Sequence, residues 1–570
     1  MSHSTRQRRQ HPSDVAAPSS SISQQYSKED KPATRQDRER SERSWRILTF
    51  MALGLLRYMS ANTNILHDCD EVFNYWEPLH FLVYKSGFQT WEYSSQFALR
   101  SYLYIDFHKL AALPASWLFQ FQDDEKVRVF YAVRLFIGLI SVIADATLVV
   151  ALSRKYGRRI ASYALAMLCL TSGCFFASTS FLPSSFSMYA MSLATGLFLL
   201  GYYSAAVAIS AIGVILGWPF SFLAFLPITL YSLIKSFKRT FLAGATTSIL
   251  LLALSVAVDY YYYGRWTSSV LNLMIYNVVG GGESHLYGVE GPLFYLRNGF
   301  NNFNICFVLA LSFVAIVPFL RKKYTPEFLI AISPIYIWIG FMSLQPHKEE
   351  RFLYPIYPLL CVAASAVIES FPDLVGSKCN SEESSVVVTI LKALRPMFLA
   401  VILCSSHART FSLINGYAAP IEIYKLLEHH NDVGPGATLC VGSEWHRFPS
   451  SFFVPSFISE VRWIDDGFRG LLPLPFNETK ASPSHFNNKN KPSDEQYFRD
   501  LSRCTFLVEL QLNRPYPSRG SDLSTWETIA ALPFLDRDLS PPLHRSFFIP
   551  YMWSHKNVFG LYKLLKRIRN

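Results

Sequence analysis

Charged residues are scarce in this chain of 570 residues. Asp, Glu, Lys and Arg together make up 17% of the sequence, whereas 50% of the residues are hydrophobic and 15% are aromatic. Soluble globular proteins carry about 25% charged residues, so this composition argues against a soluble protein. Abundant apolar and aromatic residues are typical of a protein that crosses a membrane several times.

Cysteine is also sparse and shows no metal-binding spacing. The nine cysteines include no Cys-x-x-Cys pair. Four of them lie within apolar segments, where a thiol behaves as a small hydrophobic side chain: Cys169, Cys306, Cys361 and Cys404. Cys440 and Cys504 lie in a more polar region, and a disulfide between them requires that this region face an oxidising compartment. The sequence leaves that pairing open.

The net charge of +11 is not accompanied by a known nucleic-acid-binding motif. Lys and Arg concentrate in short segments between apolar runs, as they do in the cytosolic loops of membrane proteins. We therefore expect no nucleic-acid partner. The first apolar run begins near Trp45, so we also expect no cleavable signal peptide.

Composition divides the chain into three parts. Residues 1–44 are rich in Ser, Gln, Arg and Asp, which predicts a disordered cytosolic tail. Residues 45–409 alternate apolar segments with polar loops, and most segments approach the 20 residues that span a bilayer. The pattern predicts about 11 or more transmembrane helices, in the segments 45–60, 127–151, 160–177, 184–203, 204–217, 218–234, 241–259, 302–320, 325–343, 353–370 and 386–405.

The basic loops predict the orientation of these helices. Three clusters of Lys and Arg are expected in the cytosol: 154–159, 235–239 and 321–323. Alternation then places three loops in the lumen: 61–126, 260–300 and 344–352. Residues 410–570 follow on the luminal side, and their short β-branched and aromatic runs predict a small soluble α/β domain. The sequon at Asn477 lies in this domain and is a predicted glycosylation site.

Charged side chains gather in two of the luminal loops. Four carboxylates follow the first apolar segment within ten residues: Asp68, Asp70, Glu71 and Glu77. A later loop carries three basic side chains: His347, Lys348 and Arg351. Acidic residues at a membrane edge are costly to desolvate and therefore indicate a function. A carboxylate that accepts a proton, beside cations that bind a phosphate, predicts group transfer from a phospholipid-like donor to a hydroxyl.

Longer motifs carry a family resemblance. They include Cys69-Asp70-Glu71-Val72-Phe73-Asn74-Tyr75-Trp76-Glu77-Pro78, Gln89-Thr90-Trp91-Glu92-Tyr93-Ser94, Gln345-Pro346-His347-Lys348-Glu349-Glu350-Arg351-Phe352-Leu353 and Cys440-Val441-Gly442-x-Glu444-Trp445-x-Arg447-Phe448. Over roughly residues 45–570 the chain resembles the dolichyl-phosphate-mannose-dependent α-1,2-mannosyltransferases of N-glycan precursor assembly. The resemblance implies a mainly α, polytopic membrane protein of the glycosyltransferase C type, in the endoplasmic reticulum, with a luminal active site.

The resemblance also implies a reaction. Mannose passes from dolichyl phosphate mannose to a dolichyl-diphosphate-linked oligosaccharide, first when this acceptor carries six mannoses and again when it carries eight. The donor bond is β and the product bond is α, so the anomeric carbon is inverted in one step with one base. No cofactor is implied, and because the motif offers no strong metal cage we expect no required metal.

Residue roles follow from the same resemblance. Asp70 matches the acidic residue of the family's His-Pro-Asp-Glu type motif and is the expected base, although Asp68-Cys69 replaces His-Pro here. Glu71 and Asp68 are expected to support it. The donor phosphate is expected to bind His347, Lys348 and Arg351. Further candidates for substrate binding are Trp76, Glu77, Arg100 and Tyr263.

Two alternatives stand beside this hypothesis. The first is a sister enzyme with the same donor that makes an α-1,6 bond or acts on glycosylphosphatidylinositol precursors. The motif Asn74-Tyr75-Trp76-Glu77-Pro78 argues against this alternative. A non-enzymatic membrane transporter would place its charges within the membrane helices. Here the charges cluster at helix ends, apart from isolated residues such as Asp145.

Overall fold

The computed structural model describes residues 35–279, 286, 288–319, 323–376, 383–476, 486–514 and 519–568. The chain forms two units, residues 1–45 and 46–570. Helix α1 (Arg35–Thr63) begins inside the tail predicted to be disordered, so that prediction is wrong for residues 35–44. Arg and Glu are strong helix formers, and Arg35 pairs with Glu39 one turn later (Nε–Oε1 3.1 Å). Residues 1–34 lie outside the described part of the chain.

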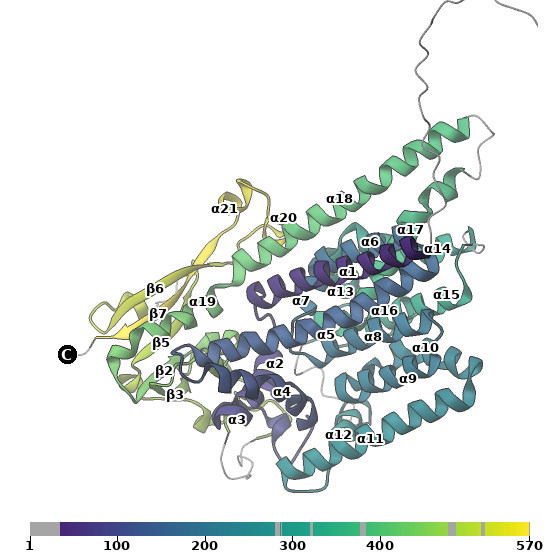
Figure 1. Cartoon of the computed structure of the whole chain (residues 1–570). Coiled ribbons are helices and arrows are strands. Elements are labelled where there is room, and N and C mark those ends of the chain that lie inside the picture. The colour runs from purple at the N-terminus through teal and green to yellow at the C-terminus, as the bar shows by residue number, and fades with distance from the viewer. Residues whose placement is uncertain are drawn as a thin grey trace, which may run out of the picture. The chain divides into compact units, whose positions relative to one another are not determined.

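Residues 46–570 are mainly helical, as predicted (Figure 1). Within the bundle, α5 packs against α4, α6 and α8, and α17 packs against α6, α14 and α18. The helices of this bundle are α4 (Tyr102–Phe119), α5 (Glu125–Tyr156), α6 (Arg158–Leu170), α7 (Ser172–Ala177), α8 (Pro183–Leu199), α9 (Tyr203–Ile212), α10 (Phe222–Lys235), α11 (Phe237–Tyr263), α12 (Ser269–Met274), α13 (Phe294–Phe303), α14 (Ile305–Ile316), α15 (Pro326–Ile332), α16 (Pro334–Leu344), α17 (Tyr357–Gly376) and α18 (Glu383–Tyr417).

Fewer helices than predicted are individually long and apolar enough to cross a membrane. Among the described residues five meet that description, or six if the bent pair α13 and α14 counts as one span. Several predicted segments instead form shorter helices, such as α9 and α10, which are separated at Gly217-Trp218-Pro219. The predicted number of about 11 therefore remains a prediction, while the helical membrane-protein class is confirmed. The five are Glu125–Tyr156, Phe237–Tyr263, Pro326–Leu344, Glu350–Pro372 and Lys392–Tyr417.

A buried ion pair joins α1 to α5. Arg57 Nη2 lies 2.9 Å from Asp145 Oδ2, and Ser192 Oγ donates to Asp145 Oδ1 at 2.7 Å. A charge in a low-dielectric interior is stable only when it is paired and hydrogen-bonded. Asp145, the isolated charge that a transporter would use, is thus fully engaged in holding helices together.

The predicted luminal loop 61–126 folds into short elements around its acidic cluster. A π-helical turn directly follows Asp70 and Glu71, and such turns are frequent at functional sites. Pro78 lies in the first turn of the next helix, where a proline costs no hydrogen bond. The elements are α2 (Cys69–Glu71), the π-helical η1 (Val72–Trp76), α3 (Glu77–Tyr84), β1 (Phe88–Gln89) and the 3₁₀ turn η2 (Trp91–Tyr93), followed by α4.

A five-stranded sheet forms the predicted α/β domain near the C-terminus. The strand order is β3-β2-β5-β7-β6, in which β3, β2 and β5 are parallel and β7 is antiparallel to both of its neighbours. The domain begins later than the predicted residue 410, because α18 continues to Tyr417 before α19 (Ala419–Lys425) packs on β6 and β7. The strands are β2 (Ala437–Val441), β3 (Ile458–Trp463), β5 (Phe506–Gln511), β6 (Trp526–Leu535) and β7 (Phe559–Arg567).

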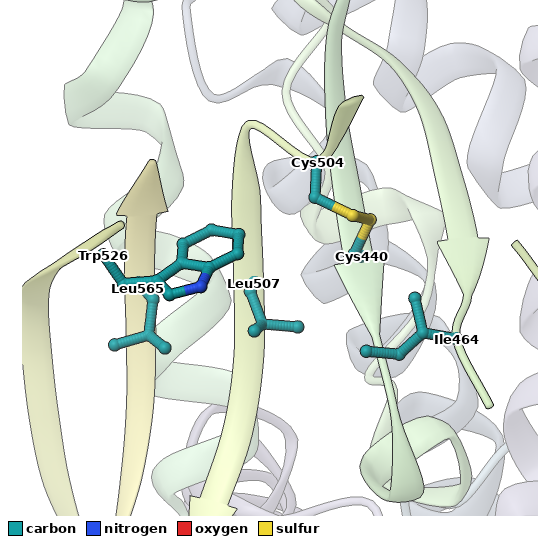
Figure 2. Packing of buried hydrophobic residues seen from close by; sticks show 6 residues of the cluster. All are labelled: Cys440, Ile464, Cys504, Leu507, Trp526 and Leu565. Atoms are coloured by element: carbon teal, nitrogen blue, oxygen red, sulfur yellow. A yellow bond between two sulfur atoms is a disulfide. The ribbon is translucent and has the colours of Figure 1, made fainter. Parts of the chain in front are cut away.

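Cys440 and Cys504 form a disulfide within this domain, which settles the pairing that the sequence left open. Figure 2 shows the bridge in a row of buried side chains that crosses the sheet. Cys440 pairs in register with Leu507, and Leu507 with Leu565. The disulfide therefore links the start of β5 to β2 across the hydrophobic core.

Candidate active site

One cavity of about 1100 Å³ brings the predicted luminal segments together. Its wall includes residues of the loop 61–126, the loop 344–352 and the C-terminal domain. Pockets of this size accommodate large ligands, and polar groups that converge in them fix the ligand orientation. The lining includes Asp68, Asp70, Phe73, Tyr75, Trp91, Glu92, Arg100, Tyr276, His347, Lys348, Glu349, Arg351, Trp445, His446 and Asn490.

Asp70 presents its carboxylate to this cavity from the three-residue helix α2. Asp68 caps that helix, and its Oδ1 accepts the Asp70 N–H at 2.9 Å. The Asp70 side chain lines the cavity and is 38% exposed. A carboxylate held in this way is accessible to a substrate hydroxyl and oriented by its own backbone.

Arg351 connects the acidic cluster to the basic one. It lies in the 3₁₀ segment η8 (Glu350–Ile356), and its Nη2 lies 2.5 Å from Asp70 Oδ2. Its Nε lies 2.9 Å from Asp68 Oδ2 and also contacts Glu349. A planar guanidinium suits such multiple contacts with carboxylates and phosphates. The structure thus brings together three residues that were predicted to act together.

The pKa values of two carboxylates in this cluster, Asp68 and Glu349, shift in opposite directions. Burial, with the nearby charges of Asp70 and Glu349, raises the pKa of Asp68 to about 7 despite Arg351. Burial alone would also raise the pKa of Glu349, but Arg351 and His347 outweigh it and hold this pKa below its usual range. Two carboxylates bound to one guanidinium therefore differ in protonation near neutral pH.

A second arginine–carboxylate pair lies on the same cavity. Arg100 binds Glu92 with both Nε and Nη2, at 3.1 and 3.0 Å, and its Nη1 donates to the Tyr75 hydroxyl at 2.9 Å. The predicted substrate-binding residue Tyr263 does not line the cavity; it is buried and its hydroxyl donates to the Arg100 carbonyl at 2.6 Å. Tyr263 thus positions Arg100.

Comparison with known proteins identifies the site's family. The model of the Alg9-like mannosyltransferase family matches residues 48–455, which is more than half of the chain. The chain belongs to the Alg9-like mannosyltransferase family. It is therefore a glycosyltransferase, as the sequence motifs predicted.

Curated relatives extend this similarity along the whole chain. "Alpha-1,2-mannosyltransferase ALG9" of Arabidopsis thaliana is 69% identical over 570 residues, covering 99% of each chain. The protein of the same name from Homo sapiens is 36% identical over 91% of this chain and 88% of its own. Among solved structures, ArnT from Cupriavidus metallidurans bound to undecaprenyl phosphate matches 75% of this chain and 86% of its own, with a TM-score of 0.45 and 12% identity.

His347 and Lys348, two of the three basic residues predicted to bind phosphate, form hydrogen bonds with neighbouring protein groups. His347 Nε2 lies 2.8 Å from Glu349 Oε1, and its Nδ1 lies 2.9 Å from the Gly288 carbonyl. Lys348 is 6% exposed, and its ammonium donates to the Glu290 carbonyl at 2.7 Å and to the Gln345 carbonyl. Lys348 therefore holds two loops together, whereas Arg351 contacts the carboxylates of Asp68 and Asp70 across the cavity.

Glu71 and Trp76 support the acidic loop from inside the protein. Glu71 Oε1 accepts the Phe181 N–H at 2.8 Å and the Trp76 indole N–H at 3.1 Å. Trp76 is fully buried, packs against Phe130 and Phe181, and does not line the cavity. This indole is therefore part of the aromatic core, and the structure does not bring it to the cavity with the other predicted site residues.

Glu77, a candidate for substrate binding, is likewise buried and does not line the cavity. Its carboxylate is 0% exposed and accepts four hydrogen bonds. Ser450 Oγ (2.7 Å), Ser451 N (2.6 Å) and Ser451 Oγ (2.7 Å) come from the C-terminal domain, and Phe88 N (2.9 Å) comes from β1. A buried carboxylate is stable only when its oxygens are satisfied in this way. Glu77 therefore fastens the C-terminal domain to the acidic loop.

The sequence did not single out several cavity residues. Glu92 stands in a quoted motif as the one acid among aromatic residues, and Trp445 and His446 stand in the motif of the C-terminal domain. Their residue types pointed to a site, but their position on the cavity depends on contacts across the chain. The predicted glycosylation site Asn477 lies outside the described residues.

A small cluster in the described residues has metal-ligand geometry. Potential ligand atoms of Asp68, Cys69 and Asp70 lie within 4.8 Å of one another. The Arg351 guanidinium binds both carboxylates and supplies a positive charge to this cluster.

Proposed function

We propose that this chain is an inverting α-1,2-mannosyltransferase of N-glycan precursor synthesis. It moves mannose from dolichyl phosphate mannose to the dolichyl-diphosphate-linked oligosaccharide, at the six-mannose and again at the eight-mannose stage. Similarity along 99% of a chain named alpha-1,2-mannosyltransferase supports this activity over the α-1,6 and glycosylphosphatidylinositol alternatives. One observation supports the mechanism most directly: Asp70 and Arg351 meet at 2.5 Å on a single cavity.

The reaction follows from the chemistry of this pair. The acceptor hydroxyl oxygen attacks the anomeric carbon, and Asp70 accepts the hydroxyl proton as general base. The bond between the anomeric carbon and the phosphate oxygen breaks, and its electron pair stays on the phosphate. Arg351 stabilises the charge that develops on this leaving group. The new bond forms on the face opposite the broken one, so the β linkage of the donor becomes an α linkage.

Arg351 has capacity for the phosphate beyond its protein contacts. Its Nε and Nη2 bind the carboxylates, whereas Nη1 has no hydrogen-bond partner among the described residues. Asp68, with its pKa of about 7, is partly protonated at neutral pH and then adds no negative charge against a phosphate. Asp70 thus accepts the proton, while the partly neutral Asp68 limits the negative charge near the phosphate.

We also propose that the cavity faces the lumen of the endoplasmic reticulum. The basic loops are expected in the cytosol, and the opposite side carries the acidic loop and the C-terminal domain. The Cys440–Cys504 disulfide supports this orientation, because disulfides persist in oxidising compartments. Glycosylation of Asn477 in microsomes would agree with it, and a fully cytosolic C-terminal domain would contradict it.

The activity is tested with the purified full chain in lipid vesicles. We expect transfer of labelled mannose from dolichyl phosphate mannose to the six-mannose acceptor, and release of that label by an α-1,2-specific mannosidase. Release only by an α-1,6-specific enzyme, or transfer only to a glycosylphosphatidylinositol precursor, would favour a sister activity. Uptake of a solute without transfer would favour the transporter.

A further inference from the structure

The C-terminal domain contributes an aromatic surface to the cavity. The 3₁₀ segment η10 (Ser443–Arg447) carries Trp445 and His446, which both line the cavity. Leu471, Leu472, Pro473 and Asn490 of the same domain extend that wall. These residues are distant in sequence from both charged loops. The proposed roles of Asp70 and Arg351 therefore do not explain what this wall does.

Trp445 packs against the acidic loop that carries the proposed base. Its ring centroid is 5.9 Å from that of Phe73, which follows Asp70 by three residues and lines the same cavity. Phe468 packs on the Trp445 ring at 4.9 Å. The indole is half-buried, so part of its surface remains open to the cavity. A ligand group in contact with that surface would lie in the same cavity as Asp70.

Buried polar contacts hold η10 in place. Glu444 is buried, and both of its oxygens bind Arg447 Nη1, at 2.9 and 2.7 Å. Asp466 Oδ2 accepts the Ser443 N–H at 3.0 Å. The Glu77 contacts with Ser450 and Ser451 fix the segment that follows. The Trp445 side chain is therefore positioned before any ligand arrives, which lowers the entropic cost of binding.

His446 adds a polar group beside the indole. Its Nδ1 lies 2.9 Å from the Ser443 carbonyl, and because a carbonyl only accepts, Nδ1 carries the proton. Nε2 has no partner among the described residues. Since a hydroxyl both donates and accepts, Nε2 can bond one. An aromatic face beside a single hydrogen-bonding nitrogen suits a sugar ring, which offers C–H groups on its face and hydroxyls at its edge.

We propose that Trp445 and His446 form a subsite for a hexose of the acceptor oligosaccharide, so that the C-terminal domain recognises the acceptor. The proposal rests on the proposed mannosyl transfer. The donor phosphate is assigned to Arg351 on another wall, and the donor lipid arrives from the membrane bundle. The acceptor glycan is polar and large, and the soluble domain is the part of the cavity wall that fits it.

The test compares Trp445→Ala, Trp445→Phe and the control Tyr551→Ala, an aromatic truncation at a 91% exposed position of the same domain. Each full-length variant is assayed in vesicles with either the oligosaccharide acceptor or the donor varied. We expect Trp445→Ala to raise the acceptor KM about tenfold, the size of an aromatic contact, with the donor KM unchanged. Trp445→Phe should retain most of the affinity, and Tyr551→Ala should match the wild type.

Two results would overturn the subsite: an unchanged acceptor KM in Trp445→Ala, or a change confined to the donor KM. Absence of transfer by the wild type would instead contradict the proposed function. If Trp445→Ala fails to fold in a thermal unfolding control, His446→Ala decides, because this exposed side chain is expendable for folding. A rise in its acceptor KM supports the subsite, and an unchanged value refutes it.

Discussion

Arg351 is the residue on which the proposed donor site depends. It binds Asp68 at 2.9 Å and Asp70 at 2.5 Å, and it retains donors for a phosphate. We expect Arg351→Ala to lower the rate of transfer about 10²–10³-fold, because a preorganised donor that stabilises leaving-group charge is worth that much. Kinetics with the donor varied should show a larger loss in kcat/KM than kinetics with the acceptor varied.

Two variants serve as controls for Arg351. Arg351→Lys keeps the charge but not the planar fork, so its loss should be smaller. Arg462→Ala removes an exposed arginine that pairs with Glu460 at 2.9 Å, and it should leave transfer unchanged. An Arg351→Ala enzyme with wild-type dependence on donor concentration would contradict the phosphate role.

Asp68 predicts a pH dependence of stability with a definite sign. Its folded pKa of about 7 lies above the ordinary value of about 3.9, so the folded protein holds an extra proton between these values. Because the folded state binds more protons, stability falls as pH rises through that window. The unfolding temperature should therefore drop between pH 5 and pH 8, and it should drop less in Asp68→Asn, which stays neutral. Parallel curves for the two proteins would refute this.

At the scale of elements, Glu77 joins the acidic loop to the C-terminal domain. A glutamine at this position has one acceptor oxygen and an amide that faces donors from Ser450 and Ser451. We expect Glu77→Gln to lower the free energy of unfolding by about 2–4 kcal/mol, the range for losing charged hydrogen bonds in the interior. Thermal unfolding in detergent measures it.

The matched control is Glu422→Gln in α19. Glu422 pairs with Lys425 at 2.9 Å, but its side chain is 51% exposed, so this pair contributes little to stability. We expect a change within about 0.5 kcal/mol. Equal effects of the two substitutions would show that the Glu77 contacts do not hold the domain in place.

Several elements could be predicted from the sequence because local signals define them. Apolar length predicted the helices such as α5 and α11, and β-branched runs predicted β2 and β5. The start of α1 at Arg35 was missed, because its charged residues resemble those of a disordered tail. The boundary between the predicted segments 204–217 and 218–234 agrees with the break between α9 and α10, because Gly217 and Pro219 interrupt a helix.

The residue types of the site could be predicted from the sequence, but the directions in which their side chains point could not. Asp70 and Arg351 were both named, whereas their contact joins residues 281 positions apart and depends on tertiary packing. Glu77 and Trp76 have the residue types of sugar-binding sites, yet the helix turns their side chains into the protein. Trp445 belongs to a motif of the C-terminal domain, but no local feature of the sequence shows which cavity its side chain lines.

At the scale of the whole molecule, three distant parts of one chain meet at one cavity. The acidic loop supplies the proposed base, the loop before α17 supplies the proposed phosphate ligand, and the C-terminal domain supplies an aromatic wall. The family match over residues 48–455 includes both charged loops and reaches Trp445 and His446, and it ends before most of the sheet domain. The bundle and the sheet domain therefore share one cavity, in which Asp70 is the proposed base.

The most direct measurement is mannosyl transfer by purified Asp70→Asn beside Asp123→Asn, a control at an exposed carboxylate. Asparagine keeps the shape of Asp70 but cannot accept the hydroxyl proton. We expect Asp70→Asn to lower the transfer rate about 10²–10⁴-fold, while its unfolding temperature stays near that of the wild type. Asp123→Asn should transfer normally. Near-normal transfer by a folded Asp70→Asn enzyme would contradict the assignment of Asp70 as the base.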